Sequence, residues 1–335
     1  MTEEYTLKID AYAHIVPSKY IKALEKLYPK AAQIFANAPA LYDEEHRFRV
    51  MDRYDSIVQV ISLDWPAINQ FIKLDHAVEL ARLANDEMAE LVSRYPDRFV
   101  AAIACLPLNN IDAALKEADR AINKLKFRGI EVGSNINDKP LDLPEFMPLY
   151  EKMSEYDLPI YIHPERTADF ADYRTEDKSK YNINSVFGWP WETTVAMARI
   201  VFSGILEKYP KLKFVTHHCG GMVPYYAERI IQHHNKYESM GGGYKEGLSK
   251  PPIQYFKMFY NDTAIHGNTA ALMCAYDFWG AGHLLFAADI PHADAQHGFT
   301  TYRKTINAIA KMGISDEEKK QIFEDNARDL MRLLI

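Results

Sequence analysis

The chain has 335 residues and a formal net charge of −7, and 48% of its residues are hydrophobic and 25% are charged. This composition supports a large buried core with an ordinary hydrophilic surface, whereas the acidic balance argues against a nucleic-acid or anionic membrane partner, because both require clustered lysine and arginine. The longest hydrophobic runs are only as long as a strand, so no membrane span is expected.

Along the chain, eight hydrophobic runs of strand length alternate with segments that have helical periodicity. Several runs, such as residues 99–106, are almost continuously hydrophobic, which is typical of parallel strands buried on both faces. Eight such alternations predict an α/β fold that closes into a (β/α)8 barrel, with residues 1–335 as one domain. An open doubly wound sheet is the structural alternative. The predicted strands cover residues 7–13, 56–62, 99–106, 129–133, 159–163, 212–217, 256–261 and 284–288.

Two connections are longer than a barrel requires. An insertion after the first strand, residues 15–55, contains two helical pieces, and a polar loop of residues 165–190 follows the fifth strand. Long loops at the functional face of a protein commonly form the walls or the lid of a substrate site. We therefore expect both connections to border the site.

Histidine or aspartate stands at the end of four predicted strands, as His14, His163, the pair His217 and His218, and Asp289. The carboxyl ends of barrel strands share one rim, so these side chains are expected to converge. A neutral imidazole can bind a divalent metal, and a carboxylate after so hydrophobic a run is costly to bury unless it is paired or metal-bound. The alternatives are histidines hydrogen-bonded to backbone and a helix N-cap at Asp289.

Two adjacent histidines raise a question of orientation. In a strand His217 and His218 would point to opposite faces, so only one is expected to face the barrel mouth. Cys219 follows them, but no Cys-His-Asn pattern supports a thiol nucleophile, and a packing role is expected. Together with Cys105 and Cys274 it leaves an odd number of cysteines without a C-x-x-C motif, which predicts a reducing, cytoplasmic location.

Several segments, taken in order, carry a specific resemblance to a known family. They are residues 47–52, 159–164, 188–193 and 202–204, then His218 with Gly220, Gly221 and Pro224, and residues 286–289. The chain resembles the amidohydrolase superfamily, in particular the branch that contains the aminocarboxymuconate-semialdehyde, γ-resorcylate and 5-carboxyvanillate decarboxylases. The resemblance covers nearly the whole chain and implies a distorted barrel with one divalent metal ion, zinc or manganese.

The resemblance also implies roles for individual residues. His14, His163 and Asp289 match metal ligands of the family. His218 matches its acid/base histidine, because the spacing to the glycines and the proline that follow fits this residue. Arg229 matches an arginine that reaches the substrate carboxylate of the neighbouring subunit, which implies a homodimer or a higher homo-oligomer. An ordinary surface arginine is the alternative for Arg229.

Tyr12 departs from the family pattern, because the first position of the strand-one motif is expected to be histidine or glutamate. A phenol has an ordinary pKa near ~10 and is a poor ligand unless it is ionised. Tyr12 could bind the metal as phenolate, hydrogen-bond a metal-bound water or the substrate, or only pack. We expect the second role. The loss of an imidazole weakens the preference for zinc and makes manganese plausible, and a metal-free site is the alternative.

Aromatic residues near the expected mouth suit a planar substrate. We expect Trp189 and Trp191 to bind the ring of a small carboxylic acid, with Trp65 and Phe187 beside them, whereas core packing is the alternative reading of each. The predicted partner is therefore a small-molecule acid, with neither nucleic acid nor membrane involved.

These features predict a metal-dependent, non-oxidative decarboxylase of an aromatic or unsaturated carboxylic acid. Asp289 or His218 would protonate the carbon that bears the carboxylate. Hydrolysis of an ester, lactone or amide, with Asp289 as general base, is the first alternative, and a non-catalytic barrel that binds a small acid is the second. No lysine occurs in residues 129–133, which favours decarboxylation, because a lysine there often bridges two metals in hydrolytic relatives of the superfamily.

Overall fold

Parallel strands form the centre of the structure, a computed structural model that describes residues 7–35, 38–64, 72–242, 248–292 and 299–335. The strands of the central sheet are β1 (Lys8–Ile15), β2 (Ile57–Leu63), β3 (Phe99–Ala102), β4 (Ala104–Cys105), β5 (Ile130–Gly133), β8 (Ile160–His163), β9 (Phe214–Thr216), β10 (Tyr260–Asp262) and β11 (Leu284–Leu285). A separate antiparallel ribbon pairs β6 (Asn135–Ile136) with β7 (Lys139–Pro140).

Hydrogen bonds join the central strands into a closed barrel. The strand orders are β1-β2-β3 and β11-β10-β9-β8-β5-β4, with every neighbour parallel. Between β3 and β4 the Ile103 N–H donates to the carbonyl of Ile61 at 2.9 Å, which links the two sheets. At the other edge, the Ala11 N–H donates to the carbonyl of Phe286 at 2.8 Å, directly after β11. The barrel predicted from the sequence is confirmed.

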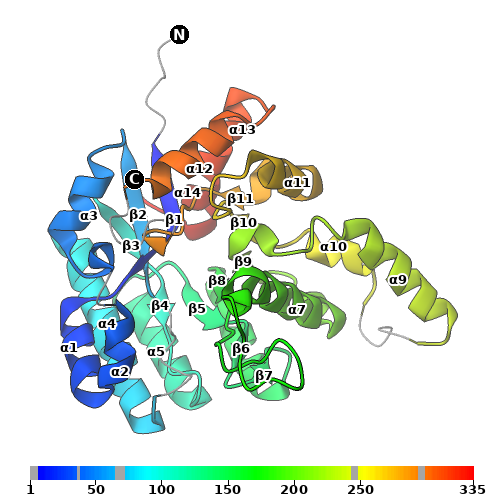
Figure 1. The fold of residues 1–335 in the computed structure, drawn as a ribbon, viewed down its shortest axis with the longest axis horizontal. Helices are drawn as coiled ribbons and strands as arrows, with labels where there is room; N and C mark the ends of the chain where they lie inside the picture. Colours follow the sequence, from blue (N-terminus) through cyan, green and yellow to red (C-terminus); the bar gives the residue numbers. More distant parts are fainter. Residues whose placement is uncertain (1–6, 36–37, 65–71, 243–247, 293–298) are drawn as a thin grey trace.

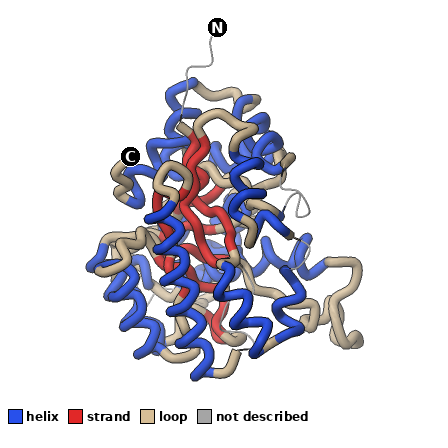
Figure 2. Tube along the Cα trace, turned by 90° about the vertical axis from the view of Figure 1, so that its left-hand side faces the viewer, coloured by secondary structure: helices blue, strands red, loops and turns tan. Residues whose placement is uncertain are grey.

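Helices surround the barrel, as Figures 1 and 2 show. The helices are α1 (Ser18–Leu27), α2 (Pro29–Ala32), α3 (Glu44–Met51), α4 (Leu74–Arg94), α5 (Ile111–Asn123), α6 (Met147–Tyr156), α7 (Trp189–Phe202), α8 (Ile205–Lys208), α9 (Ala227–Ser239), α10 (Pro252–Phe256), α11 (Thr269–Trp279), α12 (Thr301–Ala310), α13 (Asp316–Lys320) and α14 (Asn326–Met331). Helices α1 to α3 lie between β1 and β2, and a long segment without strands leads from β8 to α7. None of the described helices combines the length and the hydrophobicity that crossing a bilayer requires.

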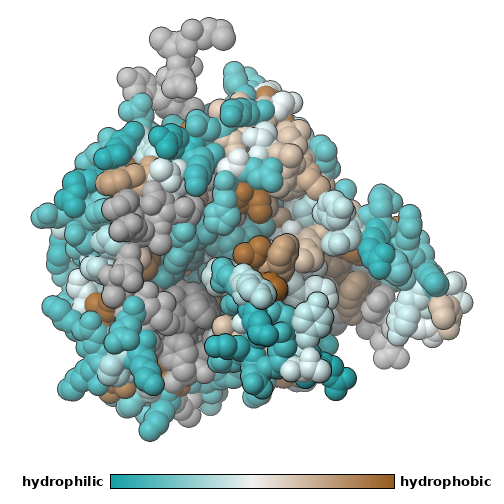
Figure 3. Space-filling view, viewed as in Figure 1, coloured by the Kyte–Doolittle hydropathy of each residue, from teal (hydrophilic) through white to brown (hydrophobic). Residues whose placement is uncertain are grey.

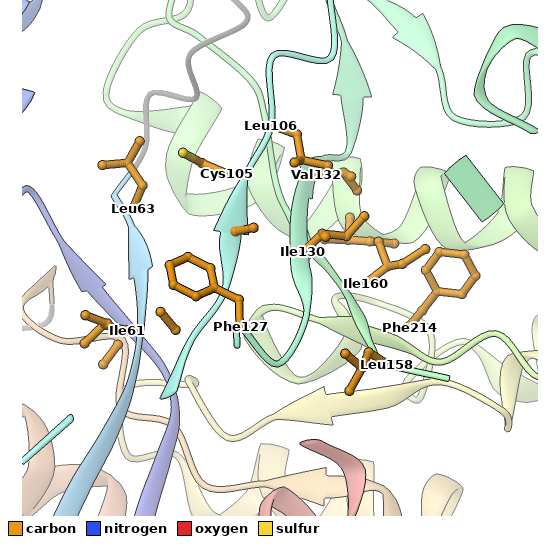
Figure 4. Packing of buried hydrophobic residues seen from close by; sticks show 14 of the residues in the cluster. Ile61, Leu63, Cys105, Leu106, Phe127, Ile130, Val132, Leu158, Ile160 and Phe214 are labelled. Atoms are coloured by element: carbon orange, nitrogen blue, oxygen red, sulfur yellow. The ribbon is translucent and has the colours of Figure 1, made fainter. Parts of the chain in front are cut away.

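The hydrophobic core has an outer and an inner layer. In the outer layer, side chains such as Ile130, Ile160 and Phe214 leave neighbouring strands to pack under the helices (Figure 4). In the inner layer, residues from opposite sides of the barrel, including Val60 and Val215, pack with the side chains of α14. The barrel interior is therefore a packed core, and a functional site has room only above it, at the rim.

A register shift in β1 determines what this strand presents at the rim. The pairing of β1 with β2 is irregular between Asp10 and Ala13. Ala11 and Tyr12 follow one another, yet both belong to the inner cluster. A bulge of this kind re-aims the residues beyond it, so Tyr12 packs in the barrel interior and His14 reaches the rim.

The predicted seventh strand, residues 256–261, was wrong in its first half. Pro252 opens α10, which extends to Phe256, and β10 begins only at Tyr260. The hydrophobic residues at the start of this run are buried as part of a helix and not of a strand. The Phe256 ring, for example, packs against the ring of Phe202 on α7. Proline at the first helical position is favourable, and this signal outweighs the short hydrophobic run.

Arg47 of α3 fastens the insertion to the barrel. Its side chain is buried, the Nε atom donates to Oε1 of Gln59 at 2.7 Å, and Nη1 donates to the carbonyls of His14 and Ala40 at 2.7 Å each. The carbonyl of His14 belongs to the strand end that faces the rim. Arg47 therefore holds the backbone of that strand end in place.

Replacement of this arginine is expected to destabilise the fold. Arg47→Met leaves three buried acceptors without their charged donor, so the free energy of unfolding should fall by about 3 kcal/mol in urea titrations. Arg49→Met is the matched control, because Arg49 lies two residues away and is exposed, and its loss should change the stability by less than about 0.5 kcal/mol. Equal effects of the two substitutions would contradict the anchoring role.

Candidate metal centre

Three histidines from separate strands converge at the rim of the barrel. His14 lies near the end of β1, His163 ends β8, and His217 directly follows β9. Their potential ligand atoms all lie within 4.8 Å of one another, and all three residues are buried. Asp289, four residues after β11, completes the group: its Oδ1 lies 3.6 Å from Nε2 of His14 and 3.4 Å from Nε2 of His217.

The outer nitrogen of each ring is already engaged. Nδ1 of His163 donates to the carbonyl of Pro164 at 2.9 Å, and Nδ1 of His217 donates to the carboxylate of Asp262. Nδ1 of His14 lies 3.2 Å from the hydroxyl of Ser62. These bonds leave the Nε2 atoms turned toward one another.

The inward-facing nitrogens satisfy a direct test for a metal site. Nε2 of His14 and Nε2 of His217 are buried and have no hydrogen-bond partner in the protein. Buried polar atoms without partners are costly, and imidazoles whose other nitrogen is fixed by an acceptor are the usual arrangement around a bound metal. The donor set fits a divalent ion.

Burial and neighbouring charges give these groups suitable protonation states. Burial and the neighbouring imidazoles hold the pKa of His14 and of His163 well below the ordinary value, so both are neutral and able to donate a lone pair. Burial alone would raise the pKa of Asp289, but the neighbouring imidazoles of His217 and His218 outweigh it and lower this pKa well below its usual range. The centre therefore contains a carboxylate next to neutral imidazoles.

His217 differs from the other two rings. Burial opposes its protonation, but the carboxylates of Asp262 and Asp289 outweigh burial and raise the pKa of His217 to about 10. In the absence of a metal this imidazole holds a proton between two carboxylates. A metal that binds there has to displace the proton, as is general for histidine ligands.

The prediction that only one of the adjacent histidines faces the mouth was wrong. Strand β9 ends at Thr216, and His218 has a φ of 54°, in the left-handed region, so the backbone turns before the strand alternation can separate the two rings. The ring centroids of His217 and His218 are 4.0 Å apart, and Nε2 of His218 lies 3.8 Å from Oδ2 of Asp289. Both imidazoles border the same carboxylate.

Trp189 forms a wall beside the centre. Its ring stacks on His218 with centroids 6.0 Å apart and planes 20° apart, and it lies edge-on to His163 at 6.0 Å. The indole Nε1 donates to the carbonyl of Arg166 at 3.2 Å, which fixes the ring. Of the predicted substrate-binding residues, Trp189 is brought to the centre.

Tyr12 lies beneath the histidines and is already hydrogen-bonded. Its ring centroid is 4.9 Å from that of His14 and also 4.9 Å from that of His217, and its hydroxyl donates to the carboxylate of Glu131 on β5. Burial and the negative charge of Glu131 raise the pKa of Tyr12 well above its ordinary value. Tyr12 is therefore a neutral phenol and not a phenolate.

Sequence reasoning missed two acidic residues near the centre. Burial raises the pKa of Glu131 to about 8, with a smaller opposite effect from the bond to Tyr12. Asp64, directly after β2, lies 2.7 Å from Nε2 of His292, whose ring is 5.5 Å from His14. The usable signals were a carboxylate inside the hydrophobic run of β5 and an aspartate at another strand end.

The remaining predicted residues are not assembled at the centre by one chain. Arg229 is exposed on α9, which projects from the barrel at the right of Figure 1 and contains no buried residue. In Figure 3 this projection carries mainly hydrophilic and neutral side chains. Trp191 and Phe187 are exposed at the start of α7, and Trp65 lies outside the described residues.

Comparison with known proteins decides the family. Residues 9–333 match the sequence profile of the family described as amidohydrolase. The chain belongs to the amidohydrolase family. Among its relatives is the γ-resorcylate decarboxylase of Rhizobium radiobacter, which is 30% identical over 297 residues and aligns with 87% of each chain.

Solved structures agree with this assignment. The dihydroxybenzoic acid decarboxylase of Polaromonas, with bound manganese and the inhibitor 2-nitroresorcinol, superposes with a TM-score of 0.82 and 27% identity over 98% of this chain and 97% of that one. The 5-carboxyvanillate decarboxylase of Sphingomonas paucimobilis superposes with a TM-score of 0.85 and 25% identity over 98% and 99%. The predicted relationship to this group of decarboxylases is confirmed.

Proposed function

We propose that this protein is a metal-dependent, non-oxidative decarboxylase of an aromatic carboxylic acid, with a hydroxyl group next to the carboxylate. The observation that carries the proposal is the convergence of His14, His163 and His217, with Asp289 beside His14 and His217, at a barrel rim that Trp189 borders. Relatives with this fold are decarboxylases of hydroxybenzoic acids.

Each part of the centre has a task in this reaction. A divalent ion held by the imidazoles and Asp289 would neutralise and orient the substrate carboxylate and the adjacent oxygen. Trp189 offers a flat hydrophobic surface for the ring, and its fixed position reduces the entropy lost when the substrate is held for reaction. The side chains of the site then position the acid and supply the one proton that the reaction needs.

Asp289 and His218 are the pair we assign to proton transfer. Nε2 of His218 lies 3.8 Å from Oδ2 of Asp289 and stacks against Trp189, so this imidazole lies between the centre and the space beside the indole. His218, which takes up a proton from solvent before each turnover, would deliver it to the ring carbon that bears the carboxylate, while the Asp289 carboxylate next to its Nε2 stabilises the protonated imidazole ring. The bond from that carbon to the carboxylate then breaks, its electron pair restores the aromatic ring, and CO2 leaves.

Isotope incorporation tests this reaction directly. Hydroxybenzoic acids incubated with the manganese-loaded protein in D2O should release CO2 and give a phenol with one deuterium at the carbon that lost the carboxylate. His218→Asn should reduce kcat by about 10²–10⁴-fold. The control His283→Asn changes a histidine that precedes β11, at the opposite end of the barrel, and should stay within about twofold. Ester or lactone hydrolysis without CO2 release from any acid tested would overturn the proposal.

We also infer that the protein acts in the cytoplasm as a homo-oligomer in which Arg229 binds the substrate carboxylate in a neighbouring subunit. All three cysteines are free, which suits a reducing compartment. The exposed helix α9 carries Arg229, and the large side chains of Tyr225, Tyr237 and Met240 nearby are exposed as well. Contact with a neighbouring subunit would bury these side chains.

Subunit mixing tests the role of Arg229. His163→Ala removes a metal-binding residue and Arg229→Ala removes the arginine, so each homo-oligomer should be nearly inactive. If the arginine acts across the interface, mixed oligomers contain some sites in which both residues are intact, and activity should reappear after subunit exchange. Failure to recover activity in mixtures that have exchanged subunits, shown by mass spectrometry, would contradict the cross-subunit role.

A further inference from the structure

In the family pattern the first position of the strand-one motif is a histidine or glutamate that binds the metal, and in this chain that position is Tyr12. One ligand of the metal is therefore unaccounted for. The structure shows that the hydroxyl of Tyr12 donates to the carboxylate of Glu131 and is therefore already engaged. With Tyr12 removed from the donor set, His14, His163 and Asp289 alone would supply only three protein ligands.

A different residue has the properties of the missing ligand. Nε2 of His217 is buried without a hydrogen-bond partner, belongs to the group formed with His14 and His163, and lies 3.4 Å from Oδ1 of Asp289. Its other nitrogen, Nδ1, donates a hydrogen bond to Asp262, which lies on β10, the strand that pairs with β9. This bond fixes the ring with Nε2 toward the centre, as outer-sphere carboxylates do for metal-bound histidines.

We propose that His217 takes the coordination position lost at Tyr12, so that three imidazoles and the Asp289 carboxylate hold the metal, while Tyr12 and Glu131 form a wall beneath it that does not bind the ion. Asp262 is the positioning residue for the new ligand. The inference rests on the metal-dependent function proposed above, and it assigns different tasks to the two adjacent histidines: His217 binds the metal and His218 faces the substrate.

The position of His218 supports this division. Its Nε2 lies 3.8 Å from the other oxygen of Asp289, and its ring stacks on Trp189. His218 lies close to His217 and Asp289, but it does not belong to the group that joins His14 and His163. The left-handed backbone at His218 and Cys219 turns the chain directly after His217, which allows two consecutive imidazoles to reach neighbouring but distinct places.

Manganese binding to the purified protein tests the inference without any substrate. The apoprotein and its variants would be titrated with Mn²⁺, with free Mn²⁺ measured by electron paramagnetic resonance and bound metal by elemental analysis. His217→Ala should raise the Kd by at least about 100-fold, because a direct ligand is worth more than an outer-sphere contact. The adjacent His218→Ala and the phenol-deleting Tyr12→Phe should each change the Kd by less than about fivefold.

A second measurement keeps the test decisive if His217→Ala does not fold. Pulsed electron paramagnetic resonance of the manganese-loaded wild-type protein with ¹⁵N-labelled histidine should reveal three coupled imidazoles. Two coupled imidazoles, or loss of metal from Tyr12→Phe with normal affinity in His217→Ala, would overturn the inference. Metal binding as described here without CO2 release would instead reject the proposed function, and decarboxylation with metal retained in His217→Ala would reject the inference alone.

Discussion

The site depends on one electrostatic constraint: three imidazole nitrogens and a carboxylate face one another where water has little access. Lone pairs directed at each other in a buried space are unfavourable, and in the metal-free protein the proton on His217 relieves part of this cost. A divalent ion bound as proposed would relieve it more completely, because it would satisfy all four donors at once. The donor set at the rim therefore suits a bound cation.

The barrel supplies the rigidity that such a cluster needs. The ligand-bearing segments end different parallel strands, and the filled interior below them leaves little freedom to move. The bulge in β1 aims Tyr12 and His14 inward, and Arg47 fixes the carbonyl of His14 from the far side. Some backbone strain lies at the rim as well, since His218, Cys219 and Asp289 have positive φ values; such strain is commonly found at functional sites.

Much of this architecture could be predicted from the sequence. Hydrophobic runs that end in histidine or aspartate indicated the barrel, its functional rim, and three of the converging residues, namely His14, His163 and Asp289. The place of His217 could not be predicted from strand alternation, because the strand ends one residue earlier and the backbone then turns left-handed. A local turn of this kind is set by tertiary packing and not by the residue pattern.

The partner of Tyr12 illustrates a second limit. Glu131 lies 119 residues away in the chain, and only closure of the barrel brings the two side chains together. From the sequence, the departure at Tyr12 suggested a weaker or lost metal site. In the structure the hydroxyl of Tyr12 donates to a carboxylate and the His217 imidazole lies close to the remaining donors, which supports the proposed exchange of one donor for another.

The most direct test of this account is the anomalous scattering of manganese in crystals of the metal-loaded protein. The account predicts one strong peak at the barrel rim, bonded to Nε2 of His14, His163 and His217 and to Asp289, with the hydroxyl of Tyr12 still on Glu131. A peak bonded to the Tyr12 oxygen with His217 turned away, or protein that releases CO2 from its substrate with no metal at the rim, would contradict it.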